Sequence, residues 1–461
     1  MRDPHKFLFL VLCLFLTGIT SLVSAQETGP LSQDEIVGTD IESTTPVDTS
    51  TGVFFLKDLL VKAYENNPSI AAARSEWLAN AEMYPQMKSL PDPNLTYKKP
   101  LDSSGSYELE LMQMVPNPRM LDLKGKRALK MSEMAQVNFE ITVRDVLIDV
   151  MKSYYELGYL NRVSAIAKTN HDLFAQLVEL GKLRNAKGEI GTSELMQAES
   201  RLAQSEYELL LLDQLTEAEK ASMRKLLAVG SDYPIGDIIL PETKIVPLDL
   251  DSLRKTVTEN NQELLSARLS IELGNTDVSL ARSMRIPDFS LGLMYGKMNT
   301  TTGTDDMGDP ITMSDDEYKI ILGMTLPIWG GKNKAMINEA REKRNAADER
   351  YKNQLNTMIE ETDRLYWKIL NLERLVVLYR DTLLPQAQSA SQMAQTLYEQ
   401  GKTEFSELLE TRMVVGNFET ASARAQADYL KALGDLSKLT GTPVAEIEIS
   451  SADIEKEGDS E

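Results

Sequence analysis

The chain has 461 residues and carries 49 Lys and Arg against 70 Asp and Glu, a formal net charge of −21 at pH 7. This acidic excess argues against nucleic acid as a partner, because nucleic-acid binding needs a clustered basic surface. His5 and His171 are the two histidines and Cys13 is the one cysteine, which argues against zinc sites, Ser-His-Asp triads and disulfide frameworks. With 25 glycines and 18 prolines in the whole chain, long uninterrupted helices are expected.

The chain begins with a segment that is typical of an export signal. Arg2 precedes an apolar run over residues 7–16, and small residues lead up to Ala25, which predicts a cleaved signal peptide over residues 1–25. An uncleaved membrane anchor is the alternative, although the run is short for a span. Cys13 follows a leucine where a lipoprotein signal has a small residue, so we expect no lipid at this cysteine.

The rest of the chain contains an internal sequence repeat of two copies. Residues 56–97 align with 250–291, and residues 188–226 align with 401–439. A repeat of about 200 residues is far longer than a solenoid unit, which indicates a duplicated half. The predicted segments are a flexible leader (26–54), a first repeat (55–249), a second repeat (250–441) and an acidic C-terminal tail (442–461).

Each repeat reads as a helix, two strands and two long helices, so the predicted fold is mainly α with a small β part. The first helix is expected over residues 55–88. Strands are indicated by alternation of apolar with small or polar residues. The clearest alternation places five apolar residues on one face of a strand: Tyr318, Ile320, Leu322, Met324 and Leu326. The pattern is weaker in the first repeat.

Such alternation fits a membrane β-barrel, and it fits a soluble antiparallel sheet equally well. If the strands meet lipid, one chain is not enough, because four strands cannot close a barrel and open edges are not tolerated in lipid. Several chains must then each donate four strands, and three chains would give twelve.

The long helices carry a second pattern. No proline occurs over residues 120–185, a stretch that would reach about 95 Å as a helix. In the return helices, positions at alternating spacings of three and four are mostly apolar, which is typical of a coiled-coil seam. An ordinary helical bundle is the alternative. The ten seam positions run from Leu195 to Leu226 in the first repeat and from Leu408 to Leu439 in the second.

Several short motifs occur in an order that resembles the TolC-like outer membrane efflux proteins. They are Glu65-Asn66-Asn67 in the first helix, Leu-Pro-Asp-Pro-Asn-Leu at 90–95, Gln-Met-Val-Pro at 113–116, and residues 401–411 opening a late helix. The Pro-Asp-Pro and Gln-x-Val-Pro elements are most similar to the heavy-metal cation efflux branch. The resemblance implies a homotrimer with a twelve-stranded outer-membrane β-barrel and an α-barrel tunnel in the periplasm. It also implies a periplasmic adaptor and an inner-membrane efflux transporter as partners.

The resemblance also assigns candidate residues. Glu407 and Glu410 are three residues apart, hence on one helix face, and they match the acidic pair with which the family narrows its periplasmic aperture. Glu194 matches Glu407 in the first repeat. A solvated helix face is the alternative for these carboxylates. The adaptor-contact tips are predicted at Lys187, Gly188, Glu189, Gly401 and Lys402, and the face from Tyr318 to Leu326 is predicted to meet lipid.

The sequence therefore predicts a passive outer-membrane exit duct of an export system, not an enzyme, with no cofactor and no metal site. Energy must come from a partner, because no nucleotide or redox motif occurs. A periplasmic coiled-coil scaffold or adaptor without a pore is the first alternative. A secreted enzyme is the second, and the shortage of histidine and cysteine disfavours it. The exported compound, whether a metal cation or a drug, would be selected by the pump.

Overall fold

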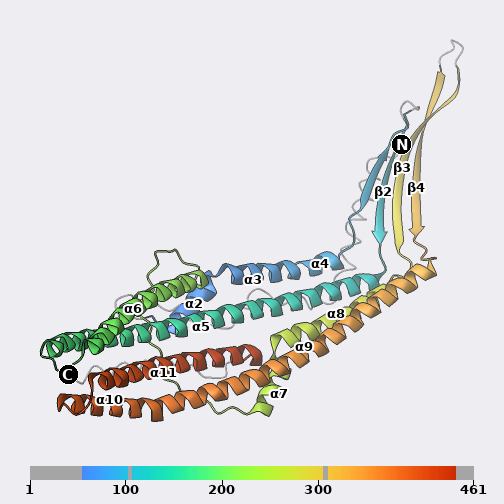
Figure 1. Ribbon diagram of the computed structural model, residues 1–461. Helices are drawn as coiled ribbons and strands as arrows, with labels where there is room; N and C mark the ends of the chain where they lie inside the picture. Colours follow the sequence, from blue (N-terminus) through green and yellow to red (C-terminus); the bar gives the residue numbers. More distant parts are fainter. Residues whose placement is uncertain (1–53, 102–105, 305–309, 443–461) are drawn as a thin grey trace. The chain divides into compact units, whose positions relative to one another are not determined.

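The computed structural model describes residues 54–101, 106–304 and 310–442 (Figure 1). The predicted signal peptide, the leader up to residue 53 and the acidic tail from residue 443 lie outside the described residues. Within the described part of the chain, no helix has a stretch long and apolar enough to cross a lipid bilayer.

The single helix expected over residues 55–88 is wrong in detail, because the chain forms three successive helices there. These are α2 (Leu56–Asn66), α3 (Pro68–Ala81) and α4 (Met83–Lys88). Pro68 has no N–H to continue α2, but it is well suited to the first position of a new helix. The second repeat has an equivalent break between α7 (Leu250–Asn260) and α8 (Gln262–Ser283).

The asparagines at these two breaks explain the repeated Glu-Asn-Asn motif. Asn67 accepts a hydrogen bond from the Ser69 N–H at 2.9 Å, and its side-chain amide donates to the carbonyl of Leu226 at 2.8 Å. In the second repeat, Asn261 accepts from the Leu264 N–H at 3.0 Å and donates to the carbonyl of Leu439 at 2.9 Å. Each asparagine therefore caps one helix and ties its start to the end of a return helix.

Four strands form one antiparallel sheet in the order β1-β2-β3-β4. Their bounds are β1 (Asn94–Lys98), β2 (Tyr107–Val115), β3 (Phe289–Thr304) and β4 (Pro310–Met324). The two hairpins lie side by side because β2 pairs with β3. The last strand ends at Met324, so the predicted strand residue Leu326 lies two positions beyond it. The sheet is open, with β1 and β4 at its edges.

The long helices form as the sequence predicts. In the first repeat they are α5 (Pro118–Ala186) and α6 (Thr192–Leu226). In the second repeat they are α9 (Gly330–Leu378), a π-helical turn (Tyr379–Leu383), α10 (Leu384–Glu399) and α11 (Phe405–Thr440). Pro385 follows the π turn. Its ring would clash with the carbonyl four residues earlier in a regular helix, and a widened turn relieves that clash.

Each strand is next to a helix in the chain, since α4 and α8 precede β1 and β3 while α5 and α9 follow β2 and β4, so the sheet adjoins a layer of helices (Figure 1). Next to the sheet, α5 packs against α3 and α4 on one side and α8 on the other, and α8 packs against α9. Further from the sheet, α6 packs on α5, α5 on α11, and α11 on α9 and α10. This order leaves α3, α4 and α6 at one side of the layer and α9 and α10 at the other.

The core lies along the long helices. One buried cluster joins α2 and α5 with the segment that follows α6, and a second joins α9 with α11. The ten seam positions of α6 and the ten of α11 are each buried or half-buried, which confirms the predicted contact stripe. Glycine allows the closest approach, since a Cβ at Gly158 would lie 3.1 Å from the backbone of Leu240.

Candidate functional site

One face of the sheet is apolar across all four strands. The register aligns Leu95 with Leu111, Leu111 with Leu293, and Leu293 with Ile320. Directly opposed residues of antiparallel strands share a face, so these four side chains form one apolar row. The predicted lipid-facing residues extend it along β4. Their exposed fractions are 52% for Tyr318, 73% for Ile320, 80% for Leu322 and 53% for Met324.

A row of tyrosines ends this apolar face. The rings of Tyr97, Tyr107, Tyr295 and Tyr318 follow one another across the four strands, with centroids 6.2, 6.0 and 5.2 Å apart. Beyond the row, the same face carries Lys297 opposite Asp316. The seven residues from Tyr318 to Met324 span about 20 Å. This height is close to the apolar band of about 25 Å, flanked by aromatic girdles, that membrane barrels present to lipid.

The opposite face of the sheet mixes small, polar and charged residues with methionines. Glu110 pairs in register with Met294, which pairs with Lys319. Lys98 forms an ion pair with Glu110 at 2.6 Å. Close to these lie Gly292 and Gly296, which provide no side chain. The alternation that the sequence predicted therefore separates an apolar face from a face suited to water.

The predicted tips are the turns between the long helices, and both have the same backbone conformation. Gly188 follows α5 with φ +72°, and Gly401 follows α10 with φ +68°. In each turn, an N–H one residue after the glycine bonds back across the end of the helix, from Glu189 to Arg184 and from Lys402 to Leu397, both at 2.9 Å. This pattern is the glycine-dependent Schellman cap. Lys187, Glu189 and Lys402 are exposed beside the glycines.

The two tips lie at the same end of the helices. A single buried cluster near them takes Phe174 and Val178 from α5, Ala198 from α6, and Phe405 and Leu408 from α11. The guanidinium of Arg184 at the end of α5 lies 4.3 Å from the ring centroid of Tyr398 at the end of α10. Burial raises the pKa of Tyr398 above its ordinary value.

The three predicted aperture carboxylates have different surroundings. Glu407 and Glu410 are exposed on the first turns of α11, and Glu407 accepts a hydrogen bond from the Thr403 hydroxyl. Glu194 is half-buried, and it accepts from the backbone N–H of Gly191 at 3.0 Å. Gln197 stands where the second repeat has Glu410. The structure therefore presents an exposed acidic pair at one tip and a helix-capping carboxylate at the other.

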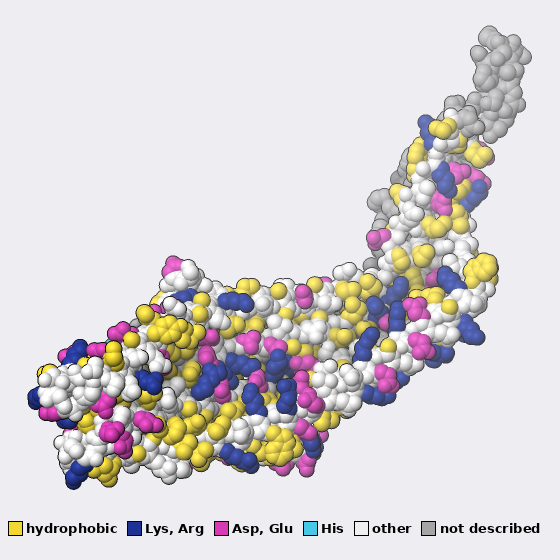
Figure 2. Space-filling view, viewed as in Figure 1, with side chains coloured by type: hydrophobic (Ala, Val, Ile, Leu, Met, Phe, Trp, Pro, Cys, Tyr) yellow, Lys and Arg dark blue, Asp and Glu magenta, His cyan; other side chains and the backbone are white. Residues whose placement is uncertain are grey.

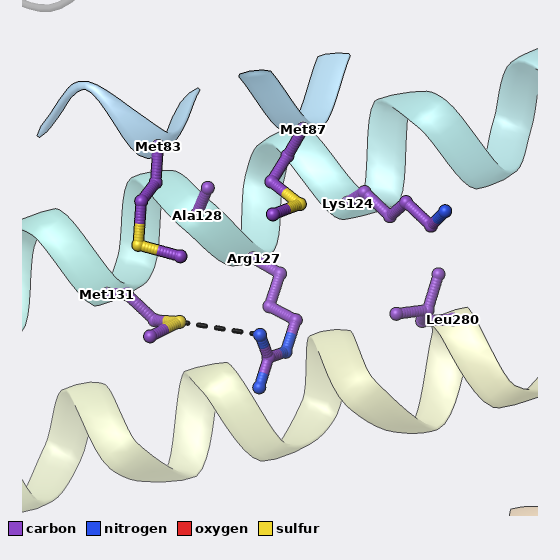
Figure 3. Close-up of a pocket in the computed structure, with 7 residues that line it drawn as sticks. All are labelled: Met83, Met87, Lys124, Arg127, Ala128, Met131 and Leu280. Carbon is purple, nitrogen blue, oxygen red and sulfur yellow. Dashed lines mark hydrogen bonds between the residues drawn. The ribbon is translucent and has the colours of Figure 1, made fainter. Parts of the chain in front are cut away.

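A pocket of about 190 Å³ lies between α4, α5 and α8, away from every predicted site (Figure 3). Its lining residues are Met83, Met87, Lys124, Arg127, Ala128, Met131 and Leu280. Arg127 donates to the sulfur of Met131 at 3.4 Å and forms an ion pair with Asp277 at 2.8 Å. Lys124 and Arg127 would repel a metal cation from this pocket, although three methionine thioethers line it.

Comparison with known proteins finds a family match over the second repeat. Residues 253–442 match the model of the family "Outer membrane efflux protein". The chain is also 21% identical to "Outer membrane protein TolC" of Escherichia coli (strain K12) over 343 residues, which cover 70% of this chain and 67% of that protein. The predicted resemblance is confirmed: residues 253–442 form an outer membrane efflux protein domain, and the chain is a homologue of TolC.

Solved structures share the fold. The outer membrane protein VceC from Vibrio cholerae superposes with a TM-score of 0.68 at 17% identity, over 85% of this chain and 97% of VceC. The Campylobacter jejuni CmeC outer membrane channel gives 0.69 at 16% identity, over 88% and 89%. CusC gives 0.69 at 14% identity, over 84% and 92%. These similarities confirm the duplicated helical and four-stranded architecture.

The sequence pattern did not reveal all the features that stand out in the structure. The tyrosine row was missed because Tyr97, Tyr107 and Tyr295 come from three strands whose register is visible only in the folded sheet. The available signal was that each predicted strand carries a tyrosine near the loop of its hairpin. The pocket was missed because it depends on the approach of α4 and α8 to α5.

Proposed function

We propose that this chain is the outer-membrane exit duct of a tripartite export system, and that it works as a homotrimer. The observation that carries the proposal is the apolar face of the sheet, which crosses all four strands and ends in a row of tyrosines. Apolar surface of this extent, exposed on the single chain, needs lipid or another protein to cover it. The height of the face and its aromatic border fit lipid.

The open sides of the chain support the trimer. β1 and β4 have free edges, which a bilayer does not tolerate. Pairing of β4 with β1 of a neighbour would satisfy both edges, and three copies would close a twelve-stranded barrel. Such a head-to-tail contact closes into a ring when the rotation between copies fits.

The helices carry matching apolar surfaces at the two sides of their layer. On α6, a second stripe faces away from α5, with exposed Met196, Tyr207, Leu210, Leu211 and Leu215. At the other side of the layer, Trp367 in α9 and Met393 in α10 are exposed by 60% and 61%. Contact between these two sides in neighbouring copies would bury the α6 stripe together with Trp367 and Met393. It would also continue the closed wall from the barrel into a helical tunnel.

The tips would then meet the periplasmic adaptor, and an inner-membrane transporter would supply the energy and select the exported compound. Two exposed turns per chain give six in a trimer. The exposed Glu407 and Glu410 would place six carboxylates around the aperture, a field that concentrates cations. CusC, whose fold this chain shares, forms a transmembrane channel.

The test is to express the full-length chain in a bacterium with two membranes, separate the membranes, and record native mass spectra of the extracted protein in detergent. We expect a homotrimer in the outer-membrane fraction. A stable monomer in the periplasmic fraction would contradict the proposal and favour a scaffold or adaptor without a pore. A second measurement is the N-terminus of the extracted protein, which we expect at Gln26.

A further inference from the structure

A basic surface surrounds the place where the strands pass into the helices. The four junctions comprise residues 86–93, 116–127, 280–288 and 325–336, which contain nine Lys and Arg against three Asp. This composition is opposite in sign to the chain as a whole, which has a net charge of −21. Figure 2 shows Lys and Arg side chains gathered near the base of the sheet. We call this surface the junction collar.

Most of the collar cations have no acidic partner within the part of the chain that the structure describes. Lys126 and Arg127 form ion pairs with Asp122 and Asp277. The other seven form no ion pair with any described residue: Lys88, Arg119, Lys124, Arg282, Arg285, Lys332 and Lys334. Six of these seven are exposed, and Lys124 is half-buried.

The collar acids do not neutralise this surplus. The Asp288 carboxylate accepts the backbone N–H of Asn117 at 2.9 Å, which holds it between two junctions. The Asp122 carboxylate is engaged by Lys126 at 2.8 Å. Asp92 and Asp288 form no ion pair with any described residue, so Asp122 alone among the three collar acids is paired with a cation. The collar thus keeps an excess of positive charge that nothing in the described chain balances.

At every junction a cation lies near an exposed apolar side chain, in the junction itself or at the adjoining strand end. The combinations are Met87 with Lys88, Val115 with Arg119, Ile286 with Arg285, and Ile328 and Trp329 with Lys332. Ile328 and Trp329 are each exposed by 71%. Tryptophan next to lysine or arginine, at the border of an apolar band, is the composition that membrane–water interfaces select.

The position of the collar along the chain also fits the headgroup layer of a bilayer. It begins where the apolar face of the sheet ends, and its cations lie within about three helical turns of the strand ends. The polar headgroup layer of a bilayer is about 5–8 Å thick on each side. Long Lys and Arg side chains can reach from nearby backbone into this layer while their stems stay on apolar surface.

We propose that the junction collar binds the anionic headgroups of phospholipids in the periplasmic leaflet of the outer membrane, and so fixes the depth of the duct in the bilayer. The proposal rests on the outer-membrane function proposed above. Its occupant follows from charge complementarity and from the continuity of the collar with the apolar sheet face. Phosphate groups of anionic lipids attract clustered Lys and Arg near a membrane surface.

Trp329 is a built-in reporter for the test. In a Trp77→Phe, Trp367→Phe background, the full-length protein is reconstituted into vesicles that mix phosphatidylcholine with phosphatidylglycerol. Either lipid is brominated near its headgroup in turn, and quenching of Trp329 fluorescence is recorded. We expect brominated phosphatidylglycerol to quench several-fold more than its share of the lipid would give, and we expect added salt to reduce this preference.

Two variants make the test specific. The collar variant is Arg119→Gln, Arg285→Gln, Lys332→Gln and Lys334→Gln. The control variant removes the same charge from exposed cations of the helices that have no described ion pair: Lys225→Gln, Arg268→Gln, Arg350→Gln and Lys368→Gln. We expect the collar variant to lose the lipid preference and the control variant to keep it.

The outcomes separate the two proposals. Equal quenching by both lipids in the unmodified background would overturn the collar while leaving the duct intact. Equal loss of preference in the two variants would show that net charge acts rather than the collar, and would also overturn it. No quenching by either lipid would place Trp329 away from the bilayer and contradict the proposed function itself.

Discussion

Met223 in the first repeat and Leu436 in the second occupy equivalent positions, 213 residues apart, and both are fully buried. The same equivalence holds for Asn67 and Asn261, whose capping bonds agree within about 0.1 Å. The two halves of the chain have thus kept their interior contacts. Their exposed parts differ, as the two hairpins and the two tips show.

The second hairpin is much the longer. β3 and β4 have 16 and 15 residues, against 5 and 9 in β1 and β2. The second tip presents an exposed acidic pair, where the first presents a capping glutamate and Gln197. In the second repeat, the π turn interrupts the long helix between α9 and α10, whereas α5 in the first repeat is continuous over 69 residues. Duplication therefore supplied two equal packing units, and only one of them carries the exposed acidic pair.

The sharpest test of equal interiors is a pair of core truncations. We expect Met223→Ala and Leu436→Ala each to lower the free energy of unfolding by about 2–5 kcal/mol, because each leaves a cavity in a fully buried cluster. The measurement is a urea titration in detergent. Ile239→Ala, at an exposed position, is the control and should change the free energy by less than about 0.5 kcal/mol. A large cost in only one repeat would break the equivalence.

The second test compares the two hairpins at their apolar face. Leu111 and Leu322 are equivalent positions, and both lie on the face predicted to meet lipid. Leu111→Lys and Leu322→Lys should each cost about 2–4 kcal/mol if they lie near the middle of the bilayer. The matched control is Met112→Lys, on the opposite face of the same strand. Unfolding from lipid vesicles measures the difference, and a control as costly as Leu111→Lys would contradict the assignment of the faces.

The third test concerns the asparagine clamps. Asn67→Ala and Asn261→Ala should each cost about 1–3 kcal/mol, because a helix N–H and a carbonyl oxygen lose their buried partners. The double variant should show additive costs, since the clamps lie in separate clusters. Asp at either position keeps the cap acceptor and loses the amide donor, so it should recover only part of the loss. Thermal unfolding of the five variants provides the comparison, and full recovery by Asp would show that the bond to the return-helix carbonyl is unimportant.

The smallest expected effect distinguishes the two tips. Glu194→Ala removes the bond to the Gly191 N–H at a helix start and should cost about 0.5–1 kcal/mol. Glu410→Ala removes an exposed side chain that has no described hydrogen bond or ion pair, and its cost should be close to zero. The same urea titration measures the change in unfolding free energy for both variants. Equal costs would mean that both tips use their carboxylates to stabilise the helix.

The parts of the fold that follow from local pattern were predictable from the sequence. The seam of α11 could be read because buried residues recur every three or four positions, and β4 because Tyr318 to Met324 alternate. Gly188 and Gly401 marked the helix ends correctly, since each adopts a positive φ that glycine accepts at low cost. The duplicated motifs supplied the order of the elements.

The remaining features depend on contacts between distant segments. The break at Asn67 was missed, although Pro68 marks it locally. The tyrosine row and the Arg184–Tyr398 contact join residues that are far apart in sequence, so no local periodicity encodes them. The different roles of Glu194 and Glu407 depend on the backbone geometry of each turn. Equivalent sequence positions therefore did not guarantee equivalent surroundings.

The most direct test of the duct and its aperture is single-channel recording in planar bilayers. The purified protein should give stable current steps, and a divalent or trivalent cation added on the side of the helical tips should lower the current by binding within the pore. The Glu407→Gln, Glu410→Gln variant should lose most of this block and part of its cation preference, while Glu194→Gln should behave as the unmodified protein does. Absence of channel current would contradict the duct. Identical block in the unmodified protein and the double variant would show that Glu407 and Glu410 only form part of a solvated helix face.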